Sequence, residues 1–191
     1  MRYIELLSPA KDFTAAVAAI DHGADAVYMG ASRFGARQAA GNSLDDIARV
    51  AEYAHRYGAR LHCTLNTVLF DDELQDAERM ARELIAAGAD ALIVQDMALR
   101  EMNLPIEMHA STQVGNTTPE GVRFLEECGF ARIILERSLS LEEIRNICAT
   151  DGATRLVITL GYAKEGDPLK YKFSKPHIPG FDYSFSGIKT S

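Results

Sequence analysis

The chain has 191 residues, of which 47% are apolar and 25% charged, and its formal net charge at pH 7 is −7. These values are typical of a soluble globular protein, most simply with one domain, and they exclude a nucleic-acid surface built on overall basicity. Its three isolated cysteines indicate no disulfide framework, and the amino terminus lacks the apolar run of a signal peptide. No apolar stretch is long enough to span a bilayer, so we expect a cytoplasmic protein outside the membrane.

One plan repeats along the first 148 residues, in which a helix ends at glycine and a short apolar run follows. Each of these glycines suits the left-handed conformation that closes a helix; they are Gly23, Gly58, Gly88 and Gly129. Continuously apolar runs such as 91–94 are typical of parallel strands covered on both faces. Strands are therefore predicted at 4–7, 26–29, 60–65, 91–94, 106–108, 132–135 and 155–160.

Helical periodicity fills the segments between these strands. The predicted helices include 45–57, 71–87, 118–128 and 140–148. Ser43 with Asp46 suits a capping box, and Asp12 is expected to cap a helix that begins at Phe13. Strand–helix alternation predicts a parallel α/β fold. Polar clusters after nearly every strand, without a glycine-rich phosphate motif after the first, favour a TIM-type (β/α) barrel over an open sheet.

The repeat is shorter than the eight units of a complete barrel, so we expect an incomplete one. After about residue 150 the sequence becomes rich in proline, glycine and aromatic residues and loses its helical period. We therefore divide the chain into a truncated barrel-like domain, 1–150, and an irregular, atypical tail, 151–191, which is either an appendix or a foreign segment. The open strand edges of such a barrel favour self-association.

A dense polar cluster follows the strand at 106–108, in the stretch PIEMHASTQVGN. His109, Ser111 and Gln113 alternate along the chain, so their side chains are predicted to point to one face. If that face is the barrel interior, they meet other strand-end groups in a pocket for a carbonyl, a carboxylate or a base edge; these groups are Asn66, Gln95, Asp96 and Arg137. The alternative is a hydrogen-bonded layer that caps the barrel.

Two earlier loops carry cationic candidates. Lys11 follows the first strand and either meets an anionic ligand or stays in solvent. Arg33 and Arg37 follow the second strand in ASRFGARQAAGN, where they either clamp a phosphate or carboxylate or remain solvated.

Hydrolytic and metal sites have less support from the sequence. A Ser-His-Asp arrangement of Ser111, His109 and Asp96 lacks a nucleophile elbow, and residues two apart on one strand rarely have triad geometry. His62 and Cys63 are adjacent, so they face opposite ways on a strand and are interpreted as core residues.

Five motifs in order, ELLSPAKDF, GADAVYMG, NTVLFDDEL, GADALIVQD and EMHASTQVGN, resemble the amino-terminal part of the collagenase-like peptidases of family U32, over about residues 1–147. The resemblance implies a (β/α) barrel and a parent activity that is either peptide hydrolysis or hydroxylation of RNA bases or ubiquinone precursors. Substrates would be an RNA or a small molecule. It also implies an iron–sulfur cluster held by cysteines that this sequence lacks. We therefore expect no cofactor in this chain and no hydroxylase activity from it alone.

The tail has a resemblance of its own. Residues of about 165–191, with SFSGIKT at 184–190, resemble a segment of the transferase that installs threonylcarbamoyl on transfer RNA adenosine. Two alternative interpretations follow. The chain is a non-catalytic truncated or fused product, or its tail is linked to threonylcarbamoyl transfer to transfer RNA.

Overall fold

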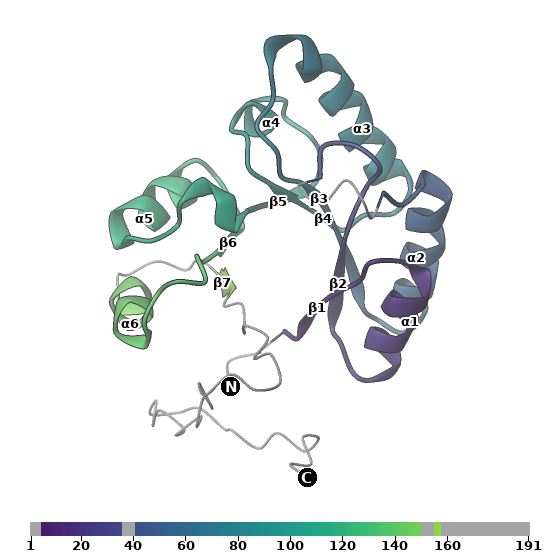
Figure 1. Cartoon of the computed structure of the whole chain (residues 1–191), viewed down its shortest axis with the longest axis horizontal. Coiled ribbons are helices and arrows are strands. Elements are labelled where there is room, and N and C mark those ends of the chain that lie inside the picture. Colours follow the sequence, from purple (N-terminus) through teal and green to yellow (C-terminus); the bar gives the residue numbers. More distant parts are fainter. Residues whose placement is uncertain (1–4, 36–40, 150–154, 158–191) are drawn as a thin grey trace. The chain divides into compact units, whose positions relative to one another are not determined.

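A computed structural model describes residues 5–35, 41–149 and 155–157, with side-chain contacts as far as residue 149. All of them belong to one compact unit, Glu5–Leu160. Seven parallel strands form one sheet in chain order: β1 (Leu7–Pro9), β2 (Ala26–Gly30), β3 (Arg60–Leu65), β4 (Ala91–Val94), β5 (Glu107–Ala110), β6 (Arg132–Ile134) and β7 (Arg155–Val157). The sheet curls, with the helices on its outer face (Figure 1). Because β1 and β7 are the ends of the strand order, this is the predicted incomplete (β/α) barrel.

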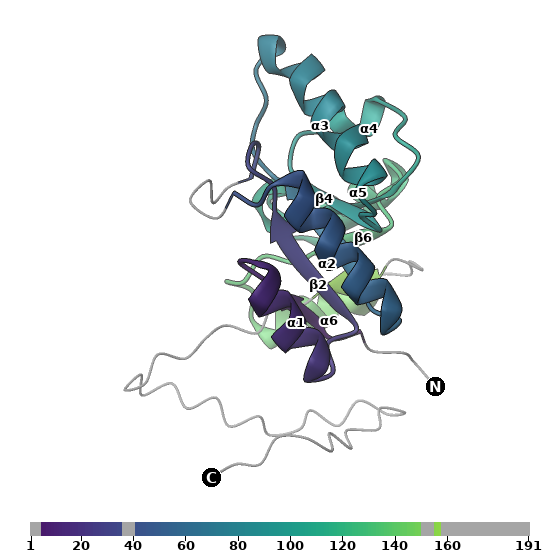
Figure 2. The same ribbon diagram turned by 90° about the vertical axis from the view of Figure 1, so that its right-hand side faces the viewer.

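The helices follow the predicted segments closely, except for the short α4, which was not predicted. They are α1 (Phe13–Asp21), α2 (Leu44–Arg56), α3 (Leu74–Ala86), α4 (Ala98–Glu101), α5 (Pro119–Glu127) and α6 (Leu141–Ala149), with 3-10 turns η2 (Asp71–Glu73) and η3 (Thr112–Val114). Helices α1, α2 and α3 lie side by side over the sheet (Figure 2). The four predicted helix-closing glycines all have positive φ, between 72° and 99°. None of the described helices is long and apolar enough to cross a membrane.

Four strands differ from their predicted limits, β2 (predicted 26–29) and β6 (predicted 132–135) by one residue each, and of the predicted 155–160 only 155–157 belong to the described residues. The first lies at Leu7–Pro9, later than the predicted 4–7, because its ladder with β2 begins where Leu7 pairs with Ala26. The fifth extends beyond the predicted 106–108 and includes His109, whose polar side chain suggested that the strand had already ended.

Alternate strand residues divide between two environments. On the outer face, apolar side chains join the helices in one core; these include Val27, Met29, Leu61, Cys63, Leu92, Val94, Met108 and Ile133. The residues between them point to the inner face of the curled sheet, because successive side chains in a strand alternate. His62, His109 and Arg132 are of this second kind, and all three are buried. The inside of this barrel is therefore partly polar.

The repeated Ala-Asp pair before a strand links neighbouring strands at their amino ends. Asp25 lies just before β2 and Leu6 just before β1. The Asp25 carboxylate accepts a hydrogen bond from Leu6 N at 2.8 Å. The Asp90 carboxylate, just before β4, accepts from Leu61 N of β3 at 2.7 Å. Each aspartate therefore replaces water as the acceptor for an amide that the sheet ladder leaves free.

We predict that Asp90→Ala lowers the free energy of unfolding by about 1–3 kcal/mol, because it leaves the amide of buried Leu61 without an acceptor. Urea denaturation followed by circular dichroism measures this. The matched control is Asp72→Ala, which removes an exposed carboxylate and should stay within about 0.5 kcal/mol of the parent. Equal losses in the two variants would contradict the role of Asp90.

Candidate functional site

The loop after β5 is held by buried side chains at the carboxyl end of the sheet. Ser111, which is 2% exposed, caps the turn η3 by accepting a hydrogen bond from Gln113 N at 3.3 Å. Asn116 is also buried, and its Nδ2 donates to the carbonyl oxygens of Ser111 at 2.7 Å and Ile134 at 2.8 Å. The prediction that His109, Ser111 and Gln113 point to one face assumes that all three belong to a strand. Because η3 starts directly after Ser111, Gln113 lies in a 3-10 turn instead.

Other predicted pocket residues lie in the adjacent loops. Gln95 follows β4 and donates from Nε2 to Gln113 O at 3.5 Å. These two residues therefore lie together at the carboxyl-end opening of the curled sheet, which we call the mouth. Asn66 is half-buried at the end of β3. Asp96 uses both carboxylate oxygens on the backbone, accepting from Leu69 N at 2.8 Å and Ala98 N at 2.9 Å. Asp96 therefore fixes the loops after β3 and β4.

The cationic candidates are dispersed. Arg137 is exposed after β6. Lys11 is exposed, 3.7 Å from the carboxylate of Asp12, which caps α1 as predicted. Arg33 lies 3.1 Å from the Asp76 carboxylate of α3, and Arg37 lies outside the described residues.

His109 lies inside the curled sheet, fully buried. Its Nε2 is 2.9 Å from Glu107 Oε1, and this oxygen is 3.3 Å from Arg132 Nε. Arg132 also makes a bidentate pair with Glu5, through Nη1 to Oε1 and through Nη2 to Oε2 at 2.9 Å. A continuous charged network therefore runs from the segment before β1 to β5 and β6.

His62 of β3 completes this interior cluster. Its ring lies 4.8 Å from that of His109, centroid to centroid, at an interplanar angle of 88°. Within the described part of the chain, neither nitrogen of His62 nor Nδ1 of His109 has a hydrogen-bond partner. His62 was predicted as a core residue, without a connection to His109. The signal was there, because each histidine alternates with apolar residues of the outer face, Leu61 and Cys63 in one case and Met108 and Ala110 in the other.

The environment favours neutral imidazoles beside charged Glu5. The pKa of His62 is lowered to about 4, mainly by burial and then by the nearby His109 and Arg132, against the opposing effect of Glu5 and Asp90. Burial also lowers the pKa of His109, although its hydrogen bond to Glu107 acts in the other direction. For Glu5, burial opposes ionisation, but the hydrogen bond and charge of Arg132 outweigh it and lower the pKa.

Nucleophilic chemistry finds little support at these positions. Burial raises the pKa of the Cys63 thiol to about 12, far from the range of a reactive thiolate. His109 Nδ1 has no partner and its Nε2 faces Glu107, so the described residues contain no Ser111–His109 hydrogen bond. A Ser-His relay requires that contact.

The cysteines present do not fit an iron–sulfur cluster. Cys63 belongs to the core between sheet and helices, whereas Cys128 ends α5 and Cys148 lies in α6. Within the described ranges, no three histidine, cysteine, aspartate or glutamate side chains are placed to share a metal ion.

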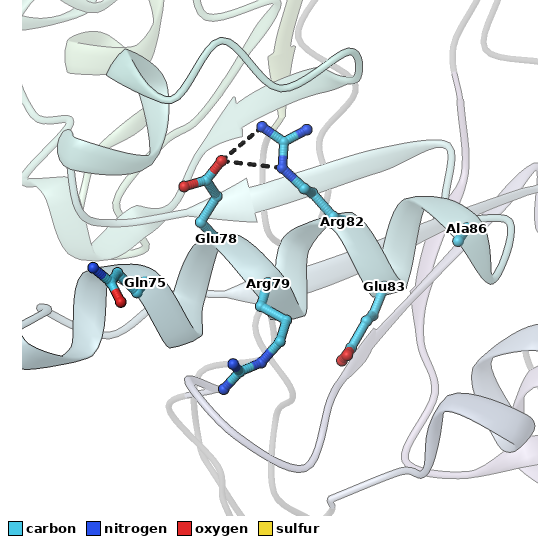
Figure 3. Close-up of a pocket in the computed structure, with 6 residues that line it drawn as sticks. All are labelled: Gln75, Glu78, Arg79, Arg82, Glu83 and Ala86. Atoms are coloured by element: carbon cyan, nitrogen blue, oxygen red, sulfur yellow. Dashed lines mark hydrogen bonds and ion pairs between the residues drawn. The ribbon is translucent and has the colours of Figure 1, made fainter.

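A hollow of about 420 Å³ lies along α3, but it is a solvent-facing helix surface. All its lining residues come from that one helix, and Glu78 binds Arg82 there (Figure 3). Since no strand-end loop contributes, it does not converge on the polar cluster after β5.

The curled parallel sheet with outer helices and polar strand-end loops defines an α/β protein of the (β/α) barrel class. The chain belongs to Peptidase family U32, whose family model matches residues 11–159. The solved structure of the U32 peptidase Mk0906 is similar in fold, with a TM-score of 0.69 at 15% identity over 88% of this chain and 73% of that one.

Curated relatives include RNA-modifying proteins. The chain is 53% identical, over 152 residues, to the 23S rRNA 5-hydroxycytidine C2501 synthase of Escherichia coli, covering 79% of this chain but 23% of the synthase. It is 32% identical to the tRNA hydroxylation protein P1 of Bacillus subtilis (75% and 35% covered) and 28% identical to a collagenase of Porphyromonas gingivalis (76% and 36% covered). The chain thus spans only a minor part of each relative. These comparisons do not support the resemblance of the tail to the threonylcarbamoyl transferase, and 158–191 lie outside the described residues.

We predict that Arg132→Met destabilises the fold by about 3–5 kcal/mol, because it leaves the carboxylate of Glu5 buried without its cation. Chemical denaturation at pH 7 measures the loss. Arg137→Met removes an exposed arginine and serves as the matched control, with an expected change within about 0.5 kcal/mol. A small effect at Arg132 would show that the interior network does not stabilise the sheet.

We also predict that stability falls as the pH drops from about 6.5 toward 4. Since the pKa of His62 is about 4 in the folded chain and the ordinary value of a histidine is 6.5, the unfolded chain binds the extra proton in this window. The stabilisation is therefore complete above about pH 6.5, and up to about 3 kcal/mol of it is lost by pH 4. The free energy of unfolding, measured by denaturation at several pH values in this range, should change less with pH for His62→Leu than for the control His22→Leu, which replaces an exposed histidine. Parallel slopes in the two variants would refute the assignment to His62.

Proposed function

We propose that this chain is part of an RNA-modifying protein that hydroxylates a pyrimidine base of ribosomal RNA. The observation that carries the proposal is the 53% identity to the E. coli 23S rRNA 5-hydroxycytidine synthase over 152 residues. Similarity to tRNA hydroxylation proteins supports the same substrate class. The collagenase relative is less similar, at 28% identity.

The geometry favours base recognition over peptide hydrolysis. Ser111 makes no hydrogen bond with His109, and burial raises the pKa of the Cys63 thiol to about 12, so neither position offers the nucleophile that covalent hydrolysis needs. The loops after β4 and β5 instead carry residues with amide side chains, Gln95 and Gln113, with Asn66 at the end of β3. Amide side chains suit the donor and acceptor edge of a base.

We assign the roles as follows. Gln95, Gln113 and Asn66 would bind the base edge, and Arg137, which is exposed in the loop after β6, would meet a phosphate. Ser111 would hold the loop after β5, and His109 would form part of the interior beneath it. The net charge of −7 implies that recognition depends on such specific contacts more than on overall electrostatic attraction.

A segment exchange tests the proposal. In the E. coli synthase, the 152-residue aligned segment is replaced by its counterpart from this chain, and the chimera is expressed in a strain that lacks the synthase. We expect 5-hydroxycytidine to reappear in 23S rRNA, measured by mass spectrometry of digested nucleosides. The same exchange with the 32% identical B. subtilis segment is the comparison and should restore less.

Point variants of the chimera test the site. Within the chimera, Gln113→Ala should lower the modified fraction about tenfold, as expected for a lost hydrogen bond to substrate. Gln75→Ala, on the exposed face of α3, is the matched control and should leave it unchanged. A chimera that is soluble at the parental level but yields no 5-hydroxycytidine would refute the proposed function.

A further inference from the structure

One row of residues crosses the inner face of β2, β3, β4 and β5, because neighbouring strands pair them in register. The row consists of Gly30, Thr64, Ile93 and His109. Each of them lies between two residues of the outer core, so the alternation of a strand turns all four to the inside. Two residues further along β3 and β4 come Asn66 and Gln95, the side chains assigned above to the base edge. The row therefore forms the floor beneath them.

This floor is closed at β4 and β5 and open at β2 and β3. Ile93 is 4% exposed and His109 is fully buried, whereas Gly30 and Thr64 are only half-buried. The Thr64 hydroxyl has no hydrogen-bond partner among the described residues, yet it is not one of the enclosed polar atoms there that lack a partner. Of the four residues, Thr64 alone offers a polar group that is both accessible and unused.

Backbone without side chains borders this hydroxyl. A Cβ added to Gly30 would lie 3.3 Å from Thr64 Oγ1, and a Cβ added to Gly35, in the loop after β2, would lie 3.7 Å from it. Neither glycine has a positive φ, so their backbone conformation is open to residues with side chains. What the two glycines provide beside Thr64 is therefore free space.

We propose that a pyrimidine base, turned out of the RNA, lies against Gly30 with its polar edge hydrogen-bonded to the Thr64 hydroxyl. This inference rests on the proposed function and names two residues that select its substrate. Enzymes that modify a base move it out of the stack and read its edge by hydrogen bonds. The Thr64 hydroxyl both donates and accepts, so it suits the carbonyl, the ring nitrogen or the amino group of cytosine.

The charges along the floor favour a neutral ring over a phosphate. Gly30, Thr64 and Ile93 are uncharged, and burial lowers the pKa of His109, which favours its neutral form. Arg132, paired with His109 in the next strand, is already engaged by Glu5 and Glu107. A phosphate placed on the described part of this row would therefore lose its hydration without gaining a free cation.

The first test is a ¹H–¹⁵N NMR titration of the full-length chain with cytidine. We expect the amide signals of Gly30 and Thr64 to shift, and ribose alone to leave them unchanged. Thr64→Val removes the hydroxyl at similar shape and should weaken binding about tenfold, whereas Thr64→Ser keeps the hydroxyl and should stay within about twofold of the parent. No shift of these two signals, equal shifts with ribose, or parental affinity in Thr64→Val would overturn the proposal.

The glycine has a matched control elsewhere in the chain. Gly30→Ala should weaken cytidine binding about tenfold, because the added methyl group occupies the place of the ring. Gly121→Ala also brings a Cβ within 3.3 Å of a threonine hydroxyl, that of Thr118, but it lies in α5 and should leave binding unchanged. Equal affinity in the two variants would contradict the role of Gly30. Urea denaturation checks that both fold, and the Thr64 variants decide the proposal if Gly30→Ala does not.

The chimera separates this inference from the proposed function. If the chimera forms 5-hydroxycytidine, Thr64→Val within it should lower the modified fraction about tenfold, and Thr64→Ser should retain it. Unchanged modification in Thr64→Val would overturn the inference and leave the proposed function in place. If the chimera without these substitutions forms no 5-hydroxycytidine, the proposed function fails, and the cytidine titration decides the binding site by itself.

Discussion

The bidentate pair between Glu5 and Arg132 is the contact on which the curvature of this sheet depends. Glu5 precedes β1 and Arg132 opens β6, so four strands separate them in the sheet order. A flat sheet would hold them far apart, since neighbouring strands are about 4.8 Å apart. Both side chains are largely buried, at 15% and 6% exposed, so neither can exchange its partner for water. The pair is therefore satisfied only when the sheet curls.

That constraint also orders the inside of the barrel. Arg132 reaches Glu107, Glu107 orients His109, and His109 packs edge to face against His62. Glu5, Glu107 and Arg132 lie at the amino ends of their strands, where barrel proteins keep residues that stabilise the fold. The Gln95 side chain and the turn that contains Gln113 lie at the opposite, carboxyl ends, where barrels keep their chemistry. His109 faces the interior and is oriented by Glu107 at the amino end of the same strand. β5 therefore contributes both to the stability of the barrel and to the loop at its carboxyl end.

Much of this architecture could be predicted from the sequence, for a physical reason. β4 matches its predicted limits because a continuously apolar run has one stable environment, a strand covered on both faces. The one-turn helix α4 was too short for a periodicity to show. At the site, residue types indicated polarity but not partners. Only the three-dimensional contacts show that Asp96 spends both oxygens on the backbone and that His62 meets His109.

The aspartate bridges at the amino ends have a consequence for how the chain is made. Asp25 secures the backbone before β1, and Asp90 secures β3, so in both cases the acceptor is synthesised after the amide that it holds. On the ribosome, a strand that has already emerged keeps an exposed backbone donor until the following helix and its closing Ala-Asp pair have left the exit tunnel. The units of β1 and β3 are then completed only by their successors, and until that point each has a backbone donor at its growing end that the chain has not yet satisfied.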